Sequence, residues 1–305
     1  MNATQTIPVA ITDFTKRYGA QEAVSNLTLD IERGSICGLL GPNGSGKTTT
    51  FKCLLGFARP TSGSMAIEGA PLTPATFEYL GYVPERSALY EWMTGAQHLE
   101  FNRRTFKSYD PKRAAELVDL FKVDLKKRVG KLSKGQHTAL AIVLAFSTRP
   151  RILILDEPAS GLDPMFQRAV LDLIIEAAAN GATVVFSSHQ IGQVERAADR
   201  VAILKNGKLI VDGTVDSLKG SEKIVEAIFD HMIPDLNGLA VDPRISRIVR
   251  SGRILRAYVN HDSEGVARRI NELAPKNVSI LDLSLEDIFI NAVGDVAAAS
   301  PNGDR

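Results

Sequence analysis

The sequence predicts an α/β fold with a parallel sheet, because short apolar runs alternate with glycine-rich or acidic loops and with amphipathic helices. Ile36 to Leu40 precedes a glycine-rich loop, and Ile152 to Leu155 precedes two acids. Strands that are buried on both faces of a sheet have such apolar runs. Ligands of open α/β sheets bind at the carboxyl ends of the strands, so we expect the functional residues in the loops that follow these runs.

The glycine-rich loop has the spacing of a phosphate-binding loop. Its sequence is Gly41-Pro42-Asn43-Gly44-Ser45-Gly46-Lys47-Thr48, followed by Thr49. Glycines let successive backbone N–H groups curl around a polyphosphate without clashes of Cβ atoms. The Lys47 ammonium can reach the terminal phosphates, and the Thr48 hydroxyl can bind Mg²⁺. An ordinary glycine-rich turn is the alternative, but a strand before the loop and a helix after it favour nucleotide binding.

Composition narrows the class of protein. The chain has 305 residues, of which 44% are hydrophobic and 23% are charged, and its formal net charge is +1. These values are typical of a soluble protein with one large core or two smaller ones, and they give no support for a nucleic-acid surface. We see no membrane span and no secretory signal. Cys37 and Cys53 flank the loop and fit a reducing cytosol, so a cytoplasmic location is expected.

Periodicity and capping signals predict the other elements of the first part of the chain. Strands are expected at residues 7–14, 27–31, 64–68 and 183–187, and a hairpin at 201–211. Residues 86–148 are expected to be mostly helical, with a helix start at Asp110-Pro111. A further helix is expected to begin at Asp163-Pro164 and to end at Asn180-Gly181.

The recognisable motifs end near residue 220, which suggests a second domain. Strands are expected at Ile254 to Val259 and near Val278 to Leu283, with a helix near Val266 to Leu273 between them. We therefore expect a first domain over residues 1–220, a small α+β module over 221–292, and a disordered tail over 293–305.

Two further segments carry chemistry. Asp156 and Glu157 follow a buried strand, where Asp156 can bind Mg²⁺ directly or through water and Glu157 can act on an attacking water. A solvated acidic strand end is the alternative. A helix follows the segment Leu132-Ser133-Lys134-Gly135-Gln136, so Ser133 can cap that helix. The free N–H groups at the start of the helix, beside the small Gly135, can bind an anion.

These motifs, in this order, resemble those of the ATP-binding subunits of ABC transporters over roughly residues 7–220. The matching segments are Lys16-Arg17-Tyr18-Gly19, the phosphate loop, Gly81-Tyr82-Val83-Pro84-Glu85, Leu132 to Gln136, Asp156-Glu157, Ala159-Ser160-Gly161-Leu162-Asp163 and Ser187-Ser188-His189. The fold implied is a P-loop NTPase core of the ABC ATPase type. An antiparallel β subdomain and a helical subdomain accompany that core, and a small C-terminal α+β module follows it.

The resemblance implies roles for particular residues of these segments. Glu157 and His189 would be catalytic, and Thr48, Glu85 and Asp156 would bind Mg²⁺. Tyr18 would stack on adenine. The other residues implied in ATP binding are Gly41, Pro42, Asn43, Gly44, Ser45, Gly46, Lys47, Thr48, Thr49, Ser133, Gly135, Gln136 and Asp163.

The implied partners are a second ATPase subunit, expected to be identical, and an integral-membrane permease on whose cytoplasmic side the chain would lie. Leu89, Tyr90, Trp92 and Met93 would contact the permease. Three features resemble the exporter branch, which pairs with the second type of ABC membrane subunit. They are Glu85 in place of the usual glutamine, Lys134 in the segment Leu132 to Gln136, which is called the signature, and the closing segment Leu283 to Phe289. The alternative is a soluble ABC-type ATPase that acts on DNA or ribosomes. A regulatory subunit without activity is disfavoured, because Lys47, Asp156, Glu157 and His189 are all present.

Overall fold

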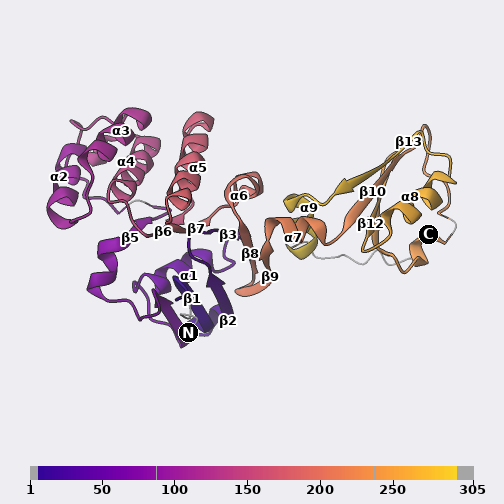
Figure 1. Cartoon of the computed structure of the whole chain (residues 1–305), viewed down its shortest axis with the longest axis horizontal. Coiled ribbons are helices and arrows are strands. Elements are labelled where there is room, and N and C mark those ends of the chain that lie inside the picture. The colour runs from indigo at the N-terminus through magenta and orange to yellow at the C-terminus, as the bar shows by residue number, and fades with distance from the viewer. Residues whose placement is uncertain (1–5, 87, 237, 294–305) are drawn as a thin grey trace, which may run out of the picture. The chain divides into compact units, whose positions relative to one another are not determined.

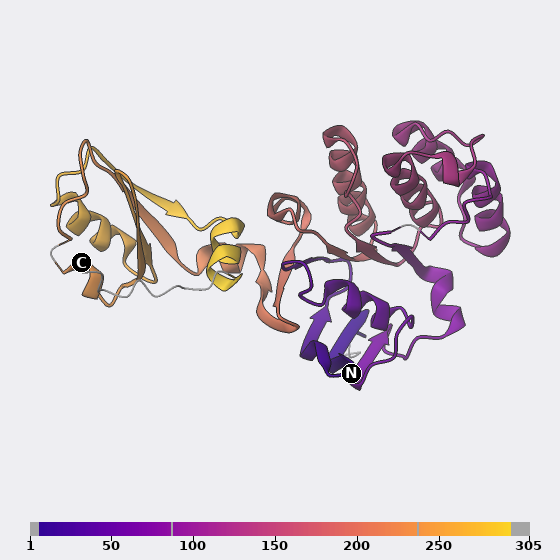
Figure 2. The same ribbon diagram turned by 180° about the vertical axis from the view of Figure 1, so that it is seen from behind.

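The computed structural model describes residues 6–86, 88–236 and 238–293, and it divides into two compact units (Figures 1 and 2). The first unit ends at Asp212 and the second begins at Gly213. This division lies a few residues before the expected boundary after residue 220, because helix α7 (Val215–Gly220) packs against α9 (Leu285–Val293) in the second unit. The expected disordered tail lies outside the described residues, apart from Val293 at the end of α9.

A six-stranded sheet is the centre of the first unit. Its order is β5 (Leu80–Val83), β6 (Ile152–Asp156), β7 (Thr183–Ser187), β3 (Ile36–Leu40), β8 (Arg200–Lys205) and β9 (Lys208–Thr214). The pairs from β5 to β8 are parallel. Every residue of β3, β6 and β7 is buried, as their apolar sequences predict. The loops after these strands therefore meet at one edge of the sheet.

A three-stranded antiparallel sheet packs beside it, in the order β2 (Gln21–Ile31), β1 (Val9–Tyr18) and β4 (Ser62–Ile67). The predicted strands are confirmed, but β1 and β2 extend further than expected, to a turn between Tyr18 and Gln21. Phe14, Leu27 and Phe51 of α1 (Lys47–Leu54) belong to one buried cluster. This cluster fixes the antiparallel sheet against the helix that follows the phosphate loop.

The predicted helical region contains α2 (Gly95–Thr105), α3 (Pro111–Phe121) and α4 (Lys134–Phe146), which gather on one side of the first unit (Figure 1). The capping predictions are confirmed, because the side chains of Asp110, Ser133 and Asp163 each accept hydrogen bonds from N–H groups of the following turn. Asp163 begins α5 (Pro164–Ala179), and α6 (Ile191–Ala197) follows β7. Short 3₁₀ turns occupy Pro74–Tyr79, Val129–Lys131 and Leu239–Val241. No helix among the described residues is both long enough and apolar enough for a membrane crossing.

The second unit is an antiparallel sheet with one helix packed on a face (Figures 1 and 2). The strand order is β11 (Ile245–Ser251), β12 (Ile254–Val259), β10 (Lys223–Ile228) and β13 (Asn277–Asp282), and the helix is α8 (Ser263–Asn271). Its core includes Val225, Ala257 and Ile270. The predicted strands and helix are confirmed, whereas β10 and β11, which mix charged and apolar residues, were not expected.

The Asp242 carboxylate, just before β11, binds two arginines of the second unit. This buried carboxylate accepts hydrogen bonds from the Arg244 guanidinium at 2.8 Å and from Arg269 Nη1 at 2.8 Å. Arg244, followed by Arg269, holds the pKa of the Asp242 carboxyl far below its ordinary value. The interaction ties the segment before β11 to helix α8, so Asp242 is expected to stabilise the second unit.

We expect Asp242→Ala to destabilise the second unit, because it leaves two guanidinium groups without their shared carboxylate. Amide hydrogen exchange of β10 and β12 should become faster by at least about tenfold. Asp282→Ala is the control, since Asp282 is an exposed partner of Lys223 in the same unit and should have little effect. Equal exchange rates in the two variants would contradict the expectation.

Candidate active site

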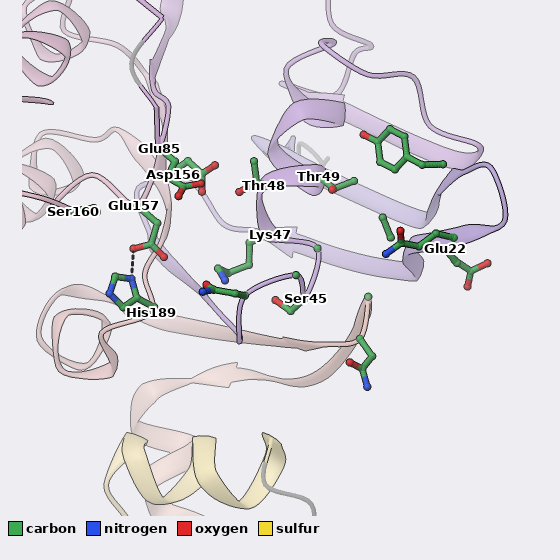
Figure 3. A pocket seen from close by; sticks show the side chains of 18 residues that line it. Glu22, Ser45, Lys47, Thr48, Thr49, Glu85, Asp156, Glu157, Ser160 and His189 are labelled. Atoms are coloured by element: carbon green, nitrogen blue, oxygen red, sulfur yellow. Dashed lines mark hydrogen bonds and ion pairs between the residues drawn. The ribbon is translucent and has the colours of Figure 1, made fainter. Parts of the chain in front are cut away.

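A cavity of about 840 Å³ lies at the carboxyl edge of the six-stranded sheet (Figure 3). Several parts of the first unit line it: the turn between β1 and β2, the phosphate loop, the residues after β5, β6 and β7, Ser160, and the turn between β8 and β9. The lining residues are Tyr18, Gln21, Glu22, Ala23, Asn43, Gly44, Ser45, Gly46, Lys47, Thr48, Thr49, Glu85, Asp156, Glu157, Ser160, His189, Asn206 and Gly207. Most residues predicted from the sequence therefore meet in one place.

The phosphate loop curls around its own lysine. Lys47 Nζ donates hydrogen bonds to the carbonyl oxygens of Gly41 at 2.7 Å and Pro42 at 3.3 Å. Gly46 has φ = 110°, and a Cβ atom at this position would lie 2.8 Å from the carbonyl oxygen of Ala23. Only glycine fits this conformation and this close approach. Glycine at this position therefore lets the loop pass close to the backbone of Ala23.

Burial and nearby acids act on Lys47 in opposite directions. Burial lowers the pKa of the Lys47 ammonium, whereas the negative charges of Glu157, Asp156 and Glu85 raise it. Burial, followed by the negative charges of Asp156 and Glu85, raises the pKa of Tyr82 to about 12. The site therefore places a lysine among three carboxylates, an arrangement suited to an anionic ligand that brings a cation.

Two buried polar atoms at the site have no hydrogen-bond partner within the described part of the chain. They are Ser45 Oγ in the phosphate loop and Asp156 Oδ2 at the end of β6. Such atoms are rare in folded proteins unless a ligand satisfies them. Ser45 Oγ can bond to a phosphate oxygen, and Asp156 Oδ2 suits a hard cation or one of its waters.

The donors near Asp156 fit magnesium. Thr48, Asp156 and Glu85 approach one another in Figure 3, and all three line the cavity. Among residues 6–86, 88–236 and 238–293, no group of three or more His, Cys, Asp and Glu side chains is arranged to hold a metal ion by itself. Mg²⁺ commonly uses one or two carboxylates together with substrate phosphates and water, so this donor set suits a cation that binds with a nucleotide.

Glu157 faces His189 across the site (Figure 3). Its Oε2 atom lies 2.7 Å from His189 Nδ1, and the Glu157 side chain is only 13% exposed. The backbone of Glu157 has φ = 51°, which is strained for a residue with a side chain. Strain of this kind occurs often at functional sites, where the surrounding structure maintains it.

Tyr18 at the end of β1 also lines the cavity. Half of its surface is exposed, and the Lys16 ammonium lies 4.7 Å from the ring centroid. Lys16 Nζ also donates to the carbonyl oxygen of Arg59 at 2.8 Å, so the ammonium is fixed beside the ring. An exposed aromatic ring in the wall of the cavity suits stacking on a planar base.

The signature residues do not line this cavity. Ser133 Oγ accepts a hydrogen bond from the N–H of Gln136 at 3.3 Å, and Asp163 caps α5. The Lys134 stem lies against Gly161, so the signature packs on the segment 159–163 of the same chain. The resemblance implied a part in ATP binding for Ser133, Gly135, Gln136 and Asp163, and that part stays a prediction.

Some residues of the site were not predicted. Gln21, Glu22 and Ala23 extend β2, and Asn206 and Gly207 form the turn that the sequence identified only as a hairpin connection. The N–H of Gly207 donates to the carbonyl oxygen of Ser45 at 3.1 Å, which brings this turn against the phosphate loop. These residues reach the site through tertiary packing, and no local pattern marks them.

The comparisons with known proteins agree with this geometry. A sequence profile of the ABC transporter family matches residues 24–160. The bacitracin transport ATP-binding protein of Bacillus licheniformis is 31% identical, over 94% of this chain and 97% of that protein. This chain belongs to the ABC transporter ATP-binding proteins. It is an ATPase of that family, and the recognition made from its sequence is confirmed.

Two other relatives of this ABC ATPase differ in how much of the chain they share. A daunorubicin resistance ATP-binding protein of Streptomyces coeruleorubidus is 30% identical, over 92% of this chain and 94% of that protein. An uncharacterized ABC transporter ATP-binding protein of a Nostoc strain is 37% identical, but over 66% of this chain and 62% of that protein. The match to the daunorubicin resistance protein is thus long enough to extend into the second unit.

Solved structures confirm the predicted fold class. The structure of an ATP-binding subunit of an ABC transporter aligns with a TM-score of 0.65 at 31% identity, and it covers 70% of this chain and 92% of that one. A dimeric ATP-binding cassette bound to ADP and Pi aligns with a TM-score of 0.62 at 24% identity, covering 68% and 98% of the two chains. The first of these supports family and fold, and the second supports the fold alone.

Gly46→Ala is expected to weaken nucleotide binding by about tenfold or more, because a Cβ atom at φ = 110° would strain the loop and press on Ala23. The affinity for ATP can be measured by titration calorimetry. Gly192→Ala in α6 is the matched control, since a Cβ atom there meets nothing within 4 Å. An unchanged affinity in Gly46→Ala would mean that the loop does not need this conformation to bind.

Proposed function

We propose that this ABC ATPase dimerises around MgATP and drives export through a separate membrane permease. The observation that supports this most is the division of its motifs. The phosphate loop, Asp156, Glu157 and His189 meet in one cavity, whereas Ser133, Gly135, Gln136 and Asp163 lie outside it. One chain therefore offers half of two sites, and a second copy would complete both.

Within one site, each residue has a part that its position supports. Tyr18 would stack on adenine, and the loop from Gly41 to Thr49 would surround the phosphates, with Lys47 and Ser45 bonded to their oxygens. Thr48, Asp156 and Glu85 would hold Mg²⁺, which when bound neutralises charge on the phosphate oxygens. Glu85 stands where the family usually has glutamine, so this site carries one more acid near the cation.

Glu157 and His189 would act on the attacking water. The Glu157 carboxylate would orient and polarise that water. His189, whose Nδ1 atom lies 2.7 Å from Glu157 Oε2, would fix the water and the γ-phosphate. Hydrolysis of ATP needs little covalent chemistry from the protein, because positioning and electrostatic stabilisation supply most of the rate. The strained backbone of Glu157 keeps its side chain aimed at this point.

ATP would also hold the dimer together. Ser133 and Gly135 of one subunit would close on the γ-phosphate bound by the other, and loss of that phosphate would release them. To move the ratio of closed to open dimers from 1:99 to 99:1, ATP must bind the closed state more favourably by about 5.5 kcal/mol. A few charge-assisted hydrogen bonds, at about 1.5–3 kcal/mol each, are of this size.

An apolar groove of about 530 Å³ supports the permease as a partner. Leu89 and Tyr90 line it, as do Phe101 of α2 and Phe57, while Trp92 is 68% exposed next to Tyr90. Met93, expected to join this surface, is buried instead. We assign the groove to a helix of the permease, because an apolar and aromatic groove of this size suits an amphipathic helix.

The relatives favour export and a location on the cytoplasmic face of the membrane. One relative bears the name of bacitracin transport and another that of daunorubicin resistance, and both match this chain over nearly its full length. The cargo would be selected by the permease. None of the comparisons supports the alternative, an ABC-type ATPase acting on DNA or ribosomes, and a net charge of +1 gives it no help.

Glu157→Gln should keep ATP bound while hydrolysis falls by about 100-fold or more, because the amide cannot act as a base. Under saturating MgATP the variant should accumulate as a dimer in size-exclusion chromatography with light scattering. Glu32→Gln, an exposed acid at the end of β2, is the control. Unchanged hydrolysis would exclude Glu157 as the residue that activates water, and a strictly monomeric variant would contradict the shared site.

Phe101→Asp should weaken attachment to the permease by about tenfold or more, because it places a charge in the apolar groove. The measurement is the fraction of the protein molecules that sediments with membranes containing the permease. Leu120→Asp is the control, since Leu120 is 45% exposed on α3, against 52% for Phe101, but does not line the groove. Equal sedimentation of both variants would remove the groove as the docking surface.

A further inference from the structure

Ser187, the last residue of β7, lies between the two acids of the site. It is fully buried, and the parallel register of β6 and β7 places it beside Asp156. Its Oγ atom lies 2.6 Å from Asp156 Oδ1 and 3.0 Å from the backbone nitrogen of Glu157. We propose that Ser187 is a positioning residue for both acids, which orients Asp156 toward Mg²⁺ and fixes the backbone of Glu157. The inference rests on the proposed roles of these two acids.

The direction of both hydrogen bonds follows from their chemistry. The N–H of Glu157 can only donate, so Ser187 Oγ accepts from it. The single hydroxyl proton of Ser187 is then donated to the Asp156 carboxylate. A chain from amide to hydroxyl to carboxylate strengthens each of its bonds in a buried setting. No rotation of the hydroxyl serves both neighbours in another way.

The bond from Ser187 occupies one oxygen of the Asp156 carboxylate and leaves the other available for a cation. Oδ1 accepts from Ser187, while Oδ2 has no partner among the described residues. Figure 3 shows this carboxylate near Thr48 and Glu85, the other proposed magnesium ligands. Partners that hydrogen-bond to a ligating carboxylate typically change metal affinity or activity by about 10- to 100-fold when removed.

For Glu157, the consequence is a fixed backbone. The residue has φ = 51°, and its peptide is held on both sides: its N–H donates to Ser187, and its carbonyl oxygen accepts from the N–H of Ser160 at 3.0 Å. These two bonds keep the side chain directed at His189. Loss of the Ser187 hydroxyl would leave a buried N–H without a partner and loosen this arrangement.

The neighbouring Ser188 provides a matched control. It is also almost fully buried, but its Oγ atom donates to Gln193 Oε1 at 2.9 Å and accepts from the N–H of Gln190 at 3.0 Å. Ser188 does not line the cavity and has no hydrogen bond to either acid among the described residues. Truncation of Ser188 therefore removes a hydroxyl of equal size and burial from the same strand end, without touching Asp156 or Glu157.

The test compares wild type, Ser187→Ala, Ser188→Ala and Ser187→Thr in equilibrium binding of a non-hydrolysable ATP analogue, with Mg²⁺ and with EDTA. In Ser187→Ala, we expect the gain in affinity produced by Mg²⁺ to shrink by about 10- to 100-fold, with affinity in EDTA unchanged. Its kcat should also fall, while Ser188→Ala behaves as wild type. Ser187→Thr, which keeps the hydroxyl, should restore the magnesium-dependent gain.

Three results would overturn the inference. They are a wild-type magnesium gain in Ser187→Ala, an equal loss in Ser187→Ala and Ser188→Ala, and an equal loss of affinity with Mg²⁺ and with EDTA, which would show a packing role only. A wild-type chain that gains no affinity from Mg²⁺ would instead overturn the proposed magnesium role of Asp156, and this inference with it.

Discussion

The parallel register of β3, β6 and β7 is the constraint on which the site depends. Because the three strands run in the same direction and are buried throughout, their carboxyl ends present the phosphate loop, the acid pair and the segment before His189 at one edge. A one-residue shift between β6 and β7 would separate Asp156 from Ser187 and Glu157 from His189. The chemistry is therefore fixed by the core, and the loops only complete it.

The sequence identified the parts of the site that local rules specify. The phosphate loop and the acids after Ile152 to Leu155 follow from spacing and apolar runs, and the caps at Asp110 and Asp163 follow from residue type. Sequence patterns missed β5, β10, β11, α6, α7 and α9, which are short or mix charges with apolar residues. Tertiary contacts decide such elements, as where α6 packs so closely on β3 that a Cβ atom on Gly38 would lie 2.3 Å from Val194.

The residues of the site that went unpredicted share the same cause. Gln21 and Asn206 reach the cavity because the first residues of β2 and the β8–β9 turn pack against the phosphate loop. Ser187 was part of a recognised motif, but its partners became visible only when the register between β6 and β7 was known. Local patterns identify the charged residues of the site, whereas only the fold identifies the neutral residues that hydrogen-bond to them and orient them.

This distinction bears on how such an ATPase can link hydrolysis to movement. The phosphate loop and the acids of one chain follow strands that are buried at every residue, whereas the signature of the same chain is carried by α4 in the helical region and packs on the segment 159–163. That segment begins two residues after Glu157, so a few residues lead from this acid to the part of the chain on which the signature packs. In the proposed dimer, a change at the γ-phosphate of one site would reach the signature that serves the other by this route, and Ser160, whose N–H donates to the carbonyl oxygen of Glu157, lies on it.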